Sequence, residues 1–254
     1  PDGERLTAET AGAYGSSDGR MVSLRLAESR DLEFPRAVVF DLPDYHFDGE
    51  LIHMRALDDL AGCASILTAL IMLANNEDVG EVYGVFTRAE EVGLIGARLM
   101  AEGGTLPKDT IVVSLEASRT LPGAVIGQGP VIRVGDATFT FDAEAEGVLL
   151  KAREELSEHQ PDFKAQRQLM SGGTCEASAF RYYGYSSTGI AFPLGNYHNA
   201  TPDGGVDAEY IHVNDFTGGV ELIVQAARSV GRRQESRSWQ RMKSIPEDYR
   251  RRLT

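Results

Sequence analysis

The sequence contains no long hydrophobic run, and no stretch approaches the ~18 consecutive apolar residues of a membrane-spanning helix. Positive charge is scarce: 25 Lys and Arg face 38 Asp and Glu, which gives a net charge of -13. This balance argues against nucleic acid or an anionic membrane as a partner. Cysteine is nearly absent, with only Cys63 and Cys175. Two cysteines are too few for a disulfide scaffold, so we expect a reducing, cytoplasmic location.

The remaining composition is that of a globular protein. The 254 residues are 42% hydrophobic and 25% charged, which is enough to build a sizeable core. From residue 51 onwards, short β-type runs alternate with segments of helical periodicity. This alternation predicts an α/β fold with a mostly parallel or mixed sheet covered by helices on both faces. The expected strands are 81–87, 110–115, 131–141 and 187–194, and the expected helices are 60–74, 94–102, 143–159 and 216–230.

Polar side chains follow the predicted strands at the point where each strand ends. Asp58 and Asp59 follow the run 51–57, Glu90 and Glu91 follow 81–87, Glu116 follows 110–115, and His198 follows 187–194. Sites in open α/β sheets form beyond the carboxyl ends of the strands. Several carboxylates at one edge repel one another unless a cation neutralises them. Carboxylates combined with one imidazole suit Zn²⁺, or a related ion such as Co²⁺ or Mn²⁺.

Each of these residues also has a purely structural explanation. Asp59 is placed to cap the helix that follows it, and a Glu-Glu pair is common in a solvated first turn. His198 alone would read as a loop residue, and His46, His53, His159 and His212 are expected to be structural. Four independent coincidences at strand ends are less probable than one shared site. The sequence therefore favours a metal site.

Three motifs resemble those of the dinuclear zinc exopeptidases, and most closely those of the tetrahedral aminopeptidases, a family of glutamyl and deblocking enzymes. They are ALDDLAG at 56–62, TRAEEVGLIGA at 87–97 and SLE at 114–116. The segments GQGP (127–130), GGT (172–174) and NYH (196–198) follow in the expected order. The likeness covers roughly residues 50–230, and residues 20–50 more weakly.

The resemblance implies a role for each site residue. Asp58 would bridge two divalent metal ions, Glu90 would be the general base, and Glu91, Glu116 and His198 would be metal ligands. Spacing alone leaves open which of the two adjacent glutamates is the base. The implied activity is hydrolysis of N-terminal residues from peptides by a metal-activated water, in a protein that we expect to be a homo-oligomer.

The resemblance also implies a domain organisation. Residues 1–50 would be the end of a small β-rich inserted domain and the return from it, residues 51–236 the catalytic domain, and residues 237–254 a charged tail. The first metal ligand of the family is a histidine in a His-x-Asp motif. His46-Phe47-Asp48 has that spelling but lies only 12 residues before Asp58, too close for an inserted domain. We expect this ligand upstream of Pro1, and we expect residues 1–254 alone to bind fewer than two metal ions.

Other functions are weighed against this one. Glu116 stands where many relatives carry Asp, which leaves a metal-dependent deacylase or carboxypeptidase as an alternative. A catalytically silent binding relative could lose its base, so the presence of Glu90 argues against that class. A glycosidase needs carboxylates ~5–9.5 Å apart across a sugar ring rather than sequence neighbours. The phosphate-binding pattern GxxxxGK[ST] is absent.

Overall fold

The computed structural model describes residues 5–15, 21–33, 35–76 and 79–253. The chain divides into two compact units, Pro1–Leu42 and Pro43–Thr254. The first unit contains an antiparallel pair of strands, β1 (Ala8–Tyr14) and β2 (Met21–Leu26), with an irregularity in the register between Thr10 and Gly12. The predicted domain boundaries at 50/51 and 236/237 remain predictions.

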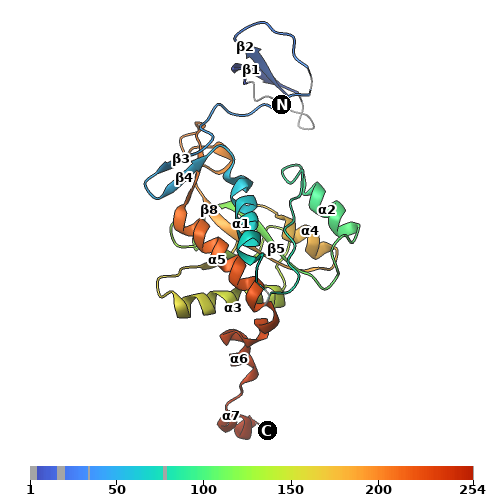
Figure 1. Ribbon diagram of the computed structural model, residues 1–254, viewed down its shortest axis with the longest axis vertical. Helices are drawn as coiled ribbons and strands as arrows, with labels where there is room; N and C mark the ends of the chain where they lie inside the picture. The colour runs from blue at the N-terminus through green and yellow to red at the C-terminus, as the bar shows by residue number, and fades with distance from the viewer. Residues whose placement is uncertain (1–4, 16–20, 34, 77–78, 254) are drawn as a thin grey trace. The chain divides into compact units, whose positions relative to one another are not determined.

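A four-stranded mixed sheet lies at the centre of the second unit (Figure 1). Its strand order is β5 (Ile111–Arg119), β8 (Ser186–Leu194), β6 (Val131–Gly135) and β7 (Gln166–Leu169). β5 runs parallel to β8 and β6 runs parallel to β7, whereas β6 and β8 are antiparallel. The predicted α/β class with a mixed sheet is therefore confirmed.

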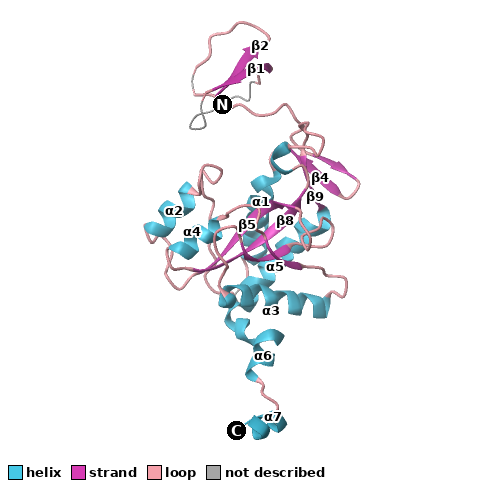
Figure 2. Ribbon diagram, turned by 180° about the vertical axis from the view of Figure 1, so that it is seen from behind, coloured by secondary structure: helices cyan, strands magenta, loops and turns pink. Residues whose placement is uncertain are grey.

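Helices pack on both faces of this sheet (Figure 2). Along β5, Ile111 and Val113 contact the core of α3 (Ala143–His159) and α5 (Val213–Ser229), and α1 (Leu57–Leu73) packs beside α5. Val112, between them, contacts the opposite core of α2 (Ile95–Glu102) and α4 (Glu176–Tyr182). Successive strand residues point to opposite faces, so one strand supports both layers.

A second, antiparallel sheet leads into the candidate site. It consists of β3 (His46–Asp48), β4 (Leu51–Met54) and β9 (Glu209–His212), and β4 pairs with β9 through Met54 opposite Glu209. β4 runs almost directly into α1, and β9 runs directly into α5. This pairing brings the start of α1 beside Glu209, which lies 151 residues away from Asp58 in sequence.

Three predictions about strands were wrong. Residues 81–87 form no strand in the described structure. The segment is irregular and largely exposed, and the side chains of Val82, Tyr83 and Phe86 are each more than two-fifths exposed to solvent. The second correction concerns β5, which continues past its predicted end at residue 115 to Arg119, so Glu116 lies inside a strand. The third concerns the expected strand 131–141, because β6 ends at Gly135.

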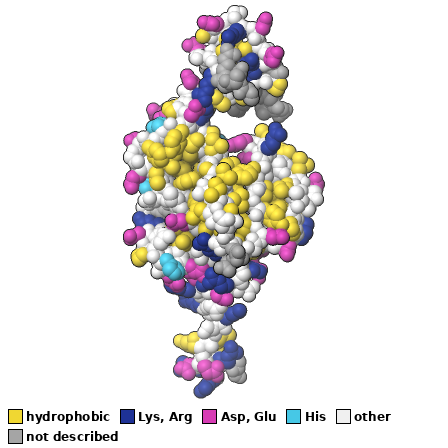
Figure 3. Space-filling model, viewed as in Figure 1, with side chains coloured by type: hydrophobic (Ala, Val, Ile, Leu, Met, Phe, Trp, Pro, Cys, Tyr) yellow, Lys and Arg dark blue, Asp and Glu magenta, His cyan; other side chains and the backbone are white. Residues whose placement is uncertain are grey.

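Apolar side chains are also exposed on α1, where Leu67 and Ile71 are more than half exposed. Figure 3 shows hydrophobic side chains gathered on the face where Figure 1 places α1.

The C-terminal segment is helical. After α5 come η2 (Val230–Glu235), α6 (Arg237–Lys243) and α7 (Glu247–Leu253). Its first part lies against α3, where Arg232 pairs with Glu155 at 2.6 Å and Arg237 pairs with Glu158 at 2.9 Å. Among the described helices, none is both long and apolar enough to cross a bilayer.

Gly219→Ala is expected to destabilise the second unit. A Cβ at this position of α5 would lie 2.3 Å from Cε1 of Phe192, which is fully buried in β8. Overpacking of about 1–3 kcal/mol outweighs the gain of about 1 kcal/mol in helix propensity. Chemical denaturation measures the loss, with Gly231→Ala as control because open space surrounds that site. Equal stability of the two variants would contradict the packing argument.

Candidate metal centre

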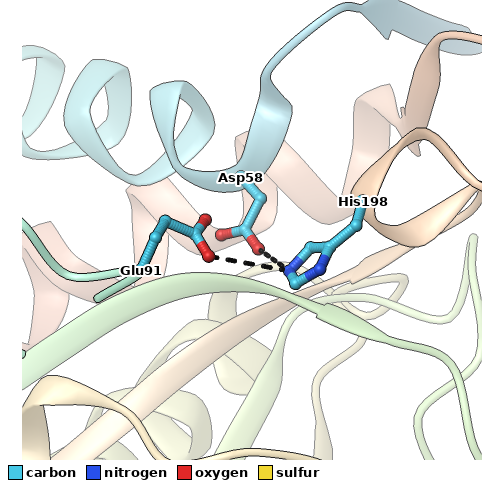
Figure 4. A group of neighbouring side chains, drawn as sticks. All are labelled: Asp58, Glu91 and His198. Atoms are coloured by element: carbon cyan, nitrogen blue, oxygen red, sulfur yellow. Dashed lines mark ion pairs between the residues drawn. The ribbon is translucent and has the colours of Figure 1, made fainter. Parts of the chain in front are cut away.

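Three of the predicted site residues meet at one point (Figure 4). Nε2 of His198 lies 3.8 Å from Oδ2 of Asp58 and 3.8 Å from Oε2 of Glu91. All three potential ligand atoms lie within 4.8 Å of one another. They come from the start of α1, the turn before α2, and the short helix η1 (Tyr197–Asn199).

The first turn of α1 is built to present Asp58. Asp58 and Asp59 have non-helical backbone angles, and the regular helix begins after them. The Asp59 carboxylate accepts a hydrogen bond from the backbone N–H of Gly62 at 2.9 Å, which confirms the predicted capping role. A Cβ on Gly62 would lie 2.2 Å from Asp59 Oδ2, so this close approach requires glycine. The Asp59 carboxylate thus caps the helix, while the Asp58 carboxylate remains available for the site.

His198 sits in a strained but well-supported loop. Its φ is +56°, and its neighbours Asn196 and Asn199 have φ of +49° and +59°. Such angles are uncommon outside glycine and persist when surrounding contacts fix them. Asn199 Nδ2 donates to the carbonyl oxygen of Arg55 at 2.9 Å, and Asn196 Nδ2 donates to that of Ala208 at 2.9 Å. The loop is thus tied to the residue that follows β4 and to the residue that precedes β9.

The adjacent glutamates point to different surroundings. A turn with φ of +59° at Ala89 precedes them, and the Glu90 carbonyl accepts hydrogen bonds from Gly93 at 3.0 Å and Leu94 at 2.8 Å. The Glu91 side chain is 62% exposed and reaches His198. Glu90 is half-buried, and Glu116 is the charge that acts on it most strongly. One glutamate can therefore bind a metal while the other remains available as a base.

The electrostatics of the site favour the binding of a cation. Burial, followed by the charges of Glu116 and Glu91, raises the pKa of Asp58 to about 8. Burial, again followed by Glu116 and Glu91, raises the pKa of Glu90 to about 7. Carboxyl groups shifted this far are destabilised in their ionised form, and a bound cation would reverse that shift.

Glu116 is placed differently from the other predicted ligands. Its Oε2 pairs with Nη1 of Arg133 at 2.8 Å, and Oγ of Ser118 donates to its Oε1 at 2.7 Å. Arg133 is only 1% exposed. Glu116 is close enough to raise the pKa values of Asp58 and Glu90, but it is not one of the three converging groups. Its role as a ligand remains a prediction.

The donor set of the three converging groups fits a divalent metal ion. Ligand distances of ~2.0–2.2 Å in tetrahedral geometry place donor atoms roughly 3.3–3.6 Å apart. The two separations of 3.8 Å from His198 are close to that spacing and too long for direct hydrogen bonds. Across the described ranges, no other group of three potential ligands comes together. His46 and His53 stack on each other with ring centroids 4.7 Å apart, as expected for structural histidines.

Sequence reasoning missed two carboxylates beside this centre. Glu176, the first residue of α4, accepts a hydrogen bond from Oγ1 of Thr87 and contributes to the raised pKa of Glu90. Glu209 accepts hydrogen bonds from the backbone N–H groups of Asp58 and His198, each at 3.0 Å. Neither follows a strand end, which was the signal that located the other residues.

A cavity of about 650 Å³ opens at the carboxylates. Asp58, Glu90, Glu91 and Glu116 line its polar end, and mainly apolar side chains of α1, the segment 80–87, β5, α3 and α5 line the rest. A group bound among the carboxylates would therefore have apolar space next to it.

A family model matches most of the chain. The family model for M42 glutamyl aminopeptidase matches residues 22–222. A protein of Acetivibrio thermocellus described as a putative aminopeptidase is 26% identical over 190 residues, which are 72% of this chain and 53% of that protein. The chain thus spans about half the length of this relative.

Solved structures show the same fold. A protein described as the PhTET1-12s dodecamer is 25% identical, with a TM-score of 0.56, over 72% of this chain and 53% of its own. The TET1 peptidase of Pyrococcus horikoshii, described as assembling into a tetrahedron or a large octahedral shell, is 22% identical. Its TM-score is 0.61, and the match covers 85% of this chain and 70% of the peptidase.

Proposed function

The chain belongs to the M42 glutamyl aminopeptidase family, and from this premise we propose that it takes part in metal-dependent hydrolysis of N-terminal residues from peptides. The observation that carries the proposal is the convergence of Asp58, Glu91 and His198 beside the half-buried Glu90. These residues come from three separate parts of the chain, so the fold brings them together and proximity in sequence does not explain the cluster. The proposal confines the chemistry to this one site.

Each residue has a defined task in this proposal. Asp58 would be the ligand common to two divalent ions, and Glu91, Glu116 and His198 would provide the remaining ligands from this chain. When bound, the ions supply Lewis-acid activation of a water molecule and of the substrate carbonyl. Glu90 would act as the general base, taking a proton from the attacking water and giving a proton to the departing amine.

The ions are proposed to be Zn²⁺, with Co²⁺ or Mn²⁺ as substitutes, because carboxylates and an imidazole are suitable ligands for all three. The ion pair between Glu116 and Arg133 has to loosen if Glu116 is to bind a metal fully. This requirement predicts that the metal site involving Glu116 is the weaker of the two.

A substrate panel with and without a chelator tests the activity. Aminoacyl-p-nitroanilides should be hydrolysed, N-acyl amino acids should not, and a chelator should abolish turnover until Zn²⁺ or Co²⁺ is restored. Turnover of N-acyl amino acids alone would favour the deacylase or carboxypeptidase alternative. Tight metal binding without turnover of either substrate would favour a silent relative.

His198→Ala should remove at least one metal ion. The imidazole provides the one nitrogen ligand of the converging group, and its loss leaves two carboxylates. Metal content after dialysis measures the effect, which should be at least a tenfold loss of affinity, by analogy with the loss of other site-orienting groups. His159→Ala is the control, because Nδ1 of His159 only contacts the carbonyl oxygen of Glu155 on the surface of α3. Unchanged metal content would remove His198 from the site.

We also propose that the protein forms a homo-oligomer that acts on peptides. Relatives of similar fold are described as a dodecamer and as tetrahedral or octahedral shells. The exposed apolar face formed by α1 and residues 81–87 supports this, since exposed apolar surface of that kind commonly marks a protein contact. Neither nucleic acid nor membrane enters the proposal, and a cytoplasmic location remains an expectation.

A further inference from the structure

We propose that Glu209 is a positioning residue that sets the backbone of two metal ligands at once; this rests on the proposed function. Each of its two carboxylate oxygens accepts one backbone hydrogen bond. Oε2 accepts the backbone N–H of Asp58 at 3.0 Å, and Oε1 accepts the backbone N–H of His198 at 3.0 Å. A single side chain thus joins ligand segments that lie 140 residues apart in sequence.

The position of Glu209 makes this link between the two ligand segments rigid. Glu209 is only 2% exposed, and its own backbone is held in β9 opposite Met54 of β4. β4 leads into the first turn of α1, which carries Asp58. The carboxylate therefore sits on the same sheet that delivers one ligand and reaches across to the loop that carries the other. The side chain cannot move without disturbing both.

The two backbone N–H groups also need this partner. Asp58 precedes the regular part of α1, and its N–H has no carbonyl of a preceding helical turn to pair with. His198 has φ of +56°, a conformation that surrounding contacts have to maintain. Removing the acceptor would leave two partly buried donors unsatisfied and release both segments. The expected result is a shift of ligand atoms rather than general unfolding.

Asp215 provides a matched control for a buried carboxylate with the same type of bonds. It is fully buried, and its two oxygens accept the backbone N–H groups of Gly127 and Gly129, each at 2.7 Å. Those glycines lie in the loop before β6, and neither is a proposed ligand. A purely structural effect of losing such a carboxylate should appear in Asp215→Asn as well as in the Glu209 variants.

Two substitutions at Glu209 separate position from charge. Glu209→Asp keeps the negative charge and both oxygens but shortens the reach by one methylene. Glu209→Gln keeps the length and replaces one acceptor by an NH₂ group, which faces an N–H donor. If Glu209 acts by position, both variants should weaken Zn²⁺ binding by ~10–100-fold, the range seen when groups that orient ligands are lost. If Glu209 acts only by charge, Glu209→Asp should bind Zn²⁺ as the wild type does.

The experiment uses the full chain and two readouts other than activity. Zn²⁺ affinity is measured by competition with a chromophoric chelator, and the visible absorption of the Co²⁺-substituted protein reports ligand geometry. We expect both Glu209 variants to lose affinity and change the Co²⁺ spectrum, whereas Asp215→Asn loses thermal stability and changes neither. Wild-type affinity and spectrum in Glu209→Asp would overturn the inference, as would equal metal losses in Asp215→Asn. If Glu209→Gln fails to fold, Glu209→Asp decides alone.

Amide hydrogen exchange in the metal-free protein separates this inference from the proposed function. The amides of Asp58 and His198 should exchange at least tenfold faster in Glu209→Asp than in the wild type. A wild-type chain that binds no Zn²⁺ would overturn the proposed function, and faster exchange of both amides would still support Glu209 as the residue that positions them. Unchanged exchange at both amides would overturn the positioning role itself.

Discussion

Glu90→Gln is expected to lower kcat by about 10²–10⁴-fold, the usual contribution of a general base, while metal content stays at the wild-type level. Glutamine has the shape of glutamate but cannot accept a proton at neutral pH. Glu90 lies outside the group of converging ligand atoms, so its loss should leave the metal in place. Turnover of an aminoacyl-p-nitroanilide, measured together with metal content, tests this expectation.

Glu91→Gln is the matched comparison, since the two residues are neighbours and the substitution is the same. Glu91 belongs to the converging group, with Oε2 3.8 Å from Nε2 of His198. Its amide variant should therefore lose metal together with activity. Metal loss in Glu90→Gln and retention in Glu91→Gln would show that the two roles are exchanged.

The sequence predicted those parts of the fold that depend on local patterns. Helical spacing with an acidic cap predicted α1, and the structure shows Asp59 bonded to Gly62 as a cap requires. Residues 81–87 were predicted to be a buried strand because they are apolar, but apolar character alone does not say what covers a segment. In the described structure no strand pairs with it, and Phe86 is 53% exposed.

The candidate site was predictable where the chemistry follows a strand end, and much less so elsewhere. Asp58 and His198 come shortly after the ends of β4 and β8, whereas Glu91 follows a segment that forms no strand in the described structure, and the three nevertheless come together. Glu116 was assigned by the same rule, but β5 continues past it, and a buried arginine from β6 pairs with its carboxylate. Glu209 was invisible because its partners are backbone N–H groups in distant segments, and such bonds leave no spacing in the sequence.

Asp58→Asn is expected to affect function and stability in opposite directions. The proposed shared ligand loses its charge, so metal binding and turnover should both fall to background. The metal-free variant should nevertheless be more stable than the metal-free wild type at pH 8. The reason is that burial and the charges of Glu116 and Glu91 raise the pKa of Asp58 to about 8, against 3.8 for the unperturbed group.

The sign of the pH effect follows from that shift. A carboxyl group with a raised pKa in the folded state binds its proton more tightly there than in the unfolded chain. Its contribution therefore destabilises the metal-free fold progressively as the pH rises from about 4 to about 8, and becomes constant above that range. Asparagine has no proton to lose, so the difference between wild type and variant should widen over this interval.

Adding Zn²⁺ should reverse the order of stability. A ligand that binds only the folded state stabilises it by about 2.7 kcal/mol at a free concentration 100 times its Kd. Only the wild type should gain this stability, because Asp58→Asn is expected not to bind Zn²⁺. Thermal denaturation at pH 5, 6.5 and 8, with chelator or with Zn²⁺, measures both effects on the same two proteins. A wild type that is the more stable protein at pH 8 in chelator would show that the Asp58 carboxylate is not repelled by its neighbours. In that case the argument that this cluster needs a cation would fail, because the burial of Asp58 together with its repulsion by Glu116 and Glu91 is its physical basis.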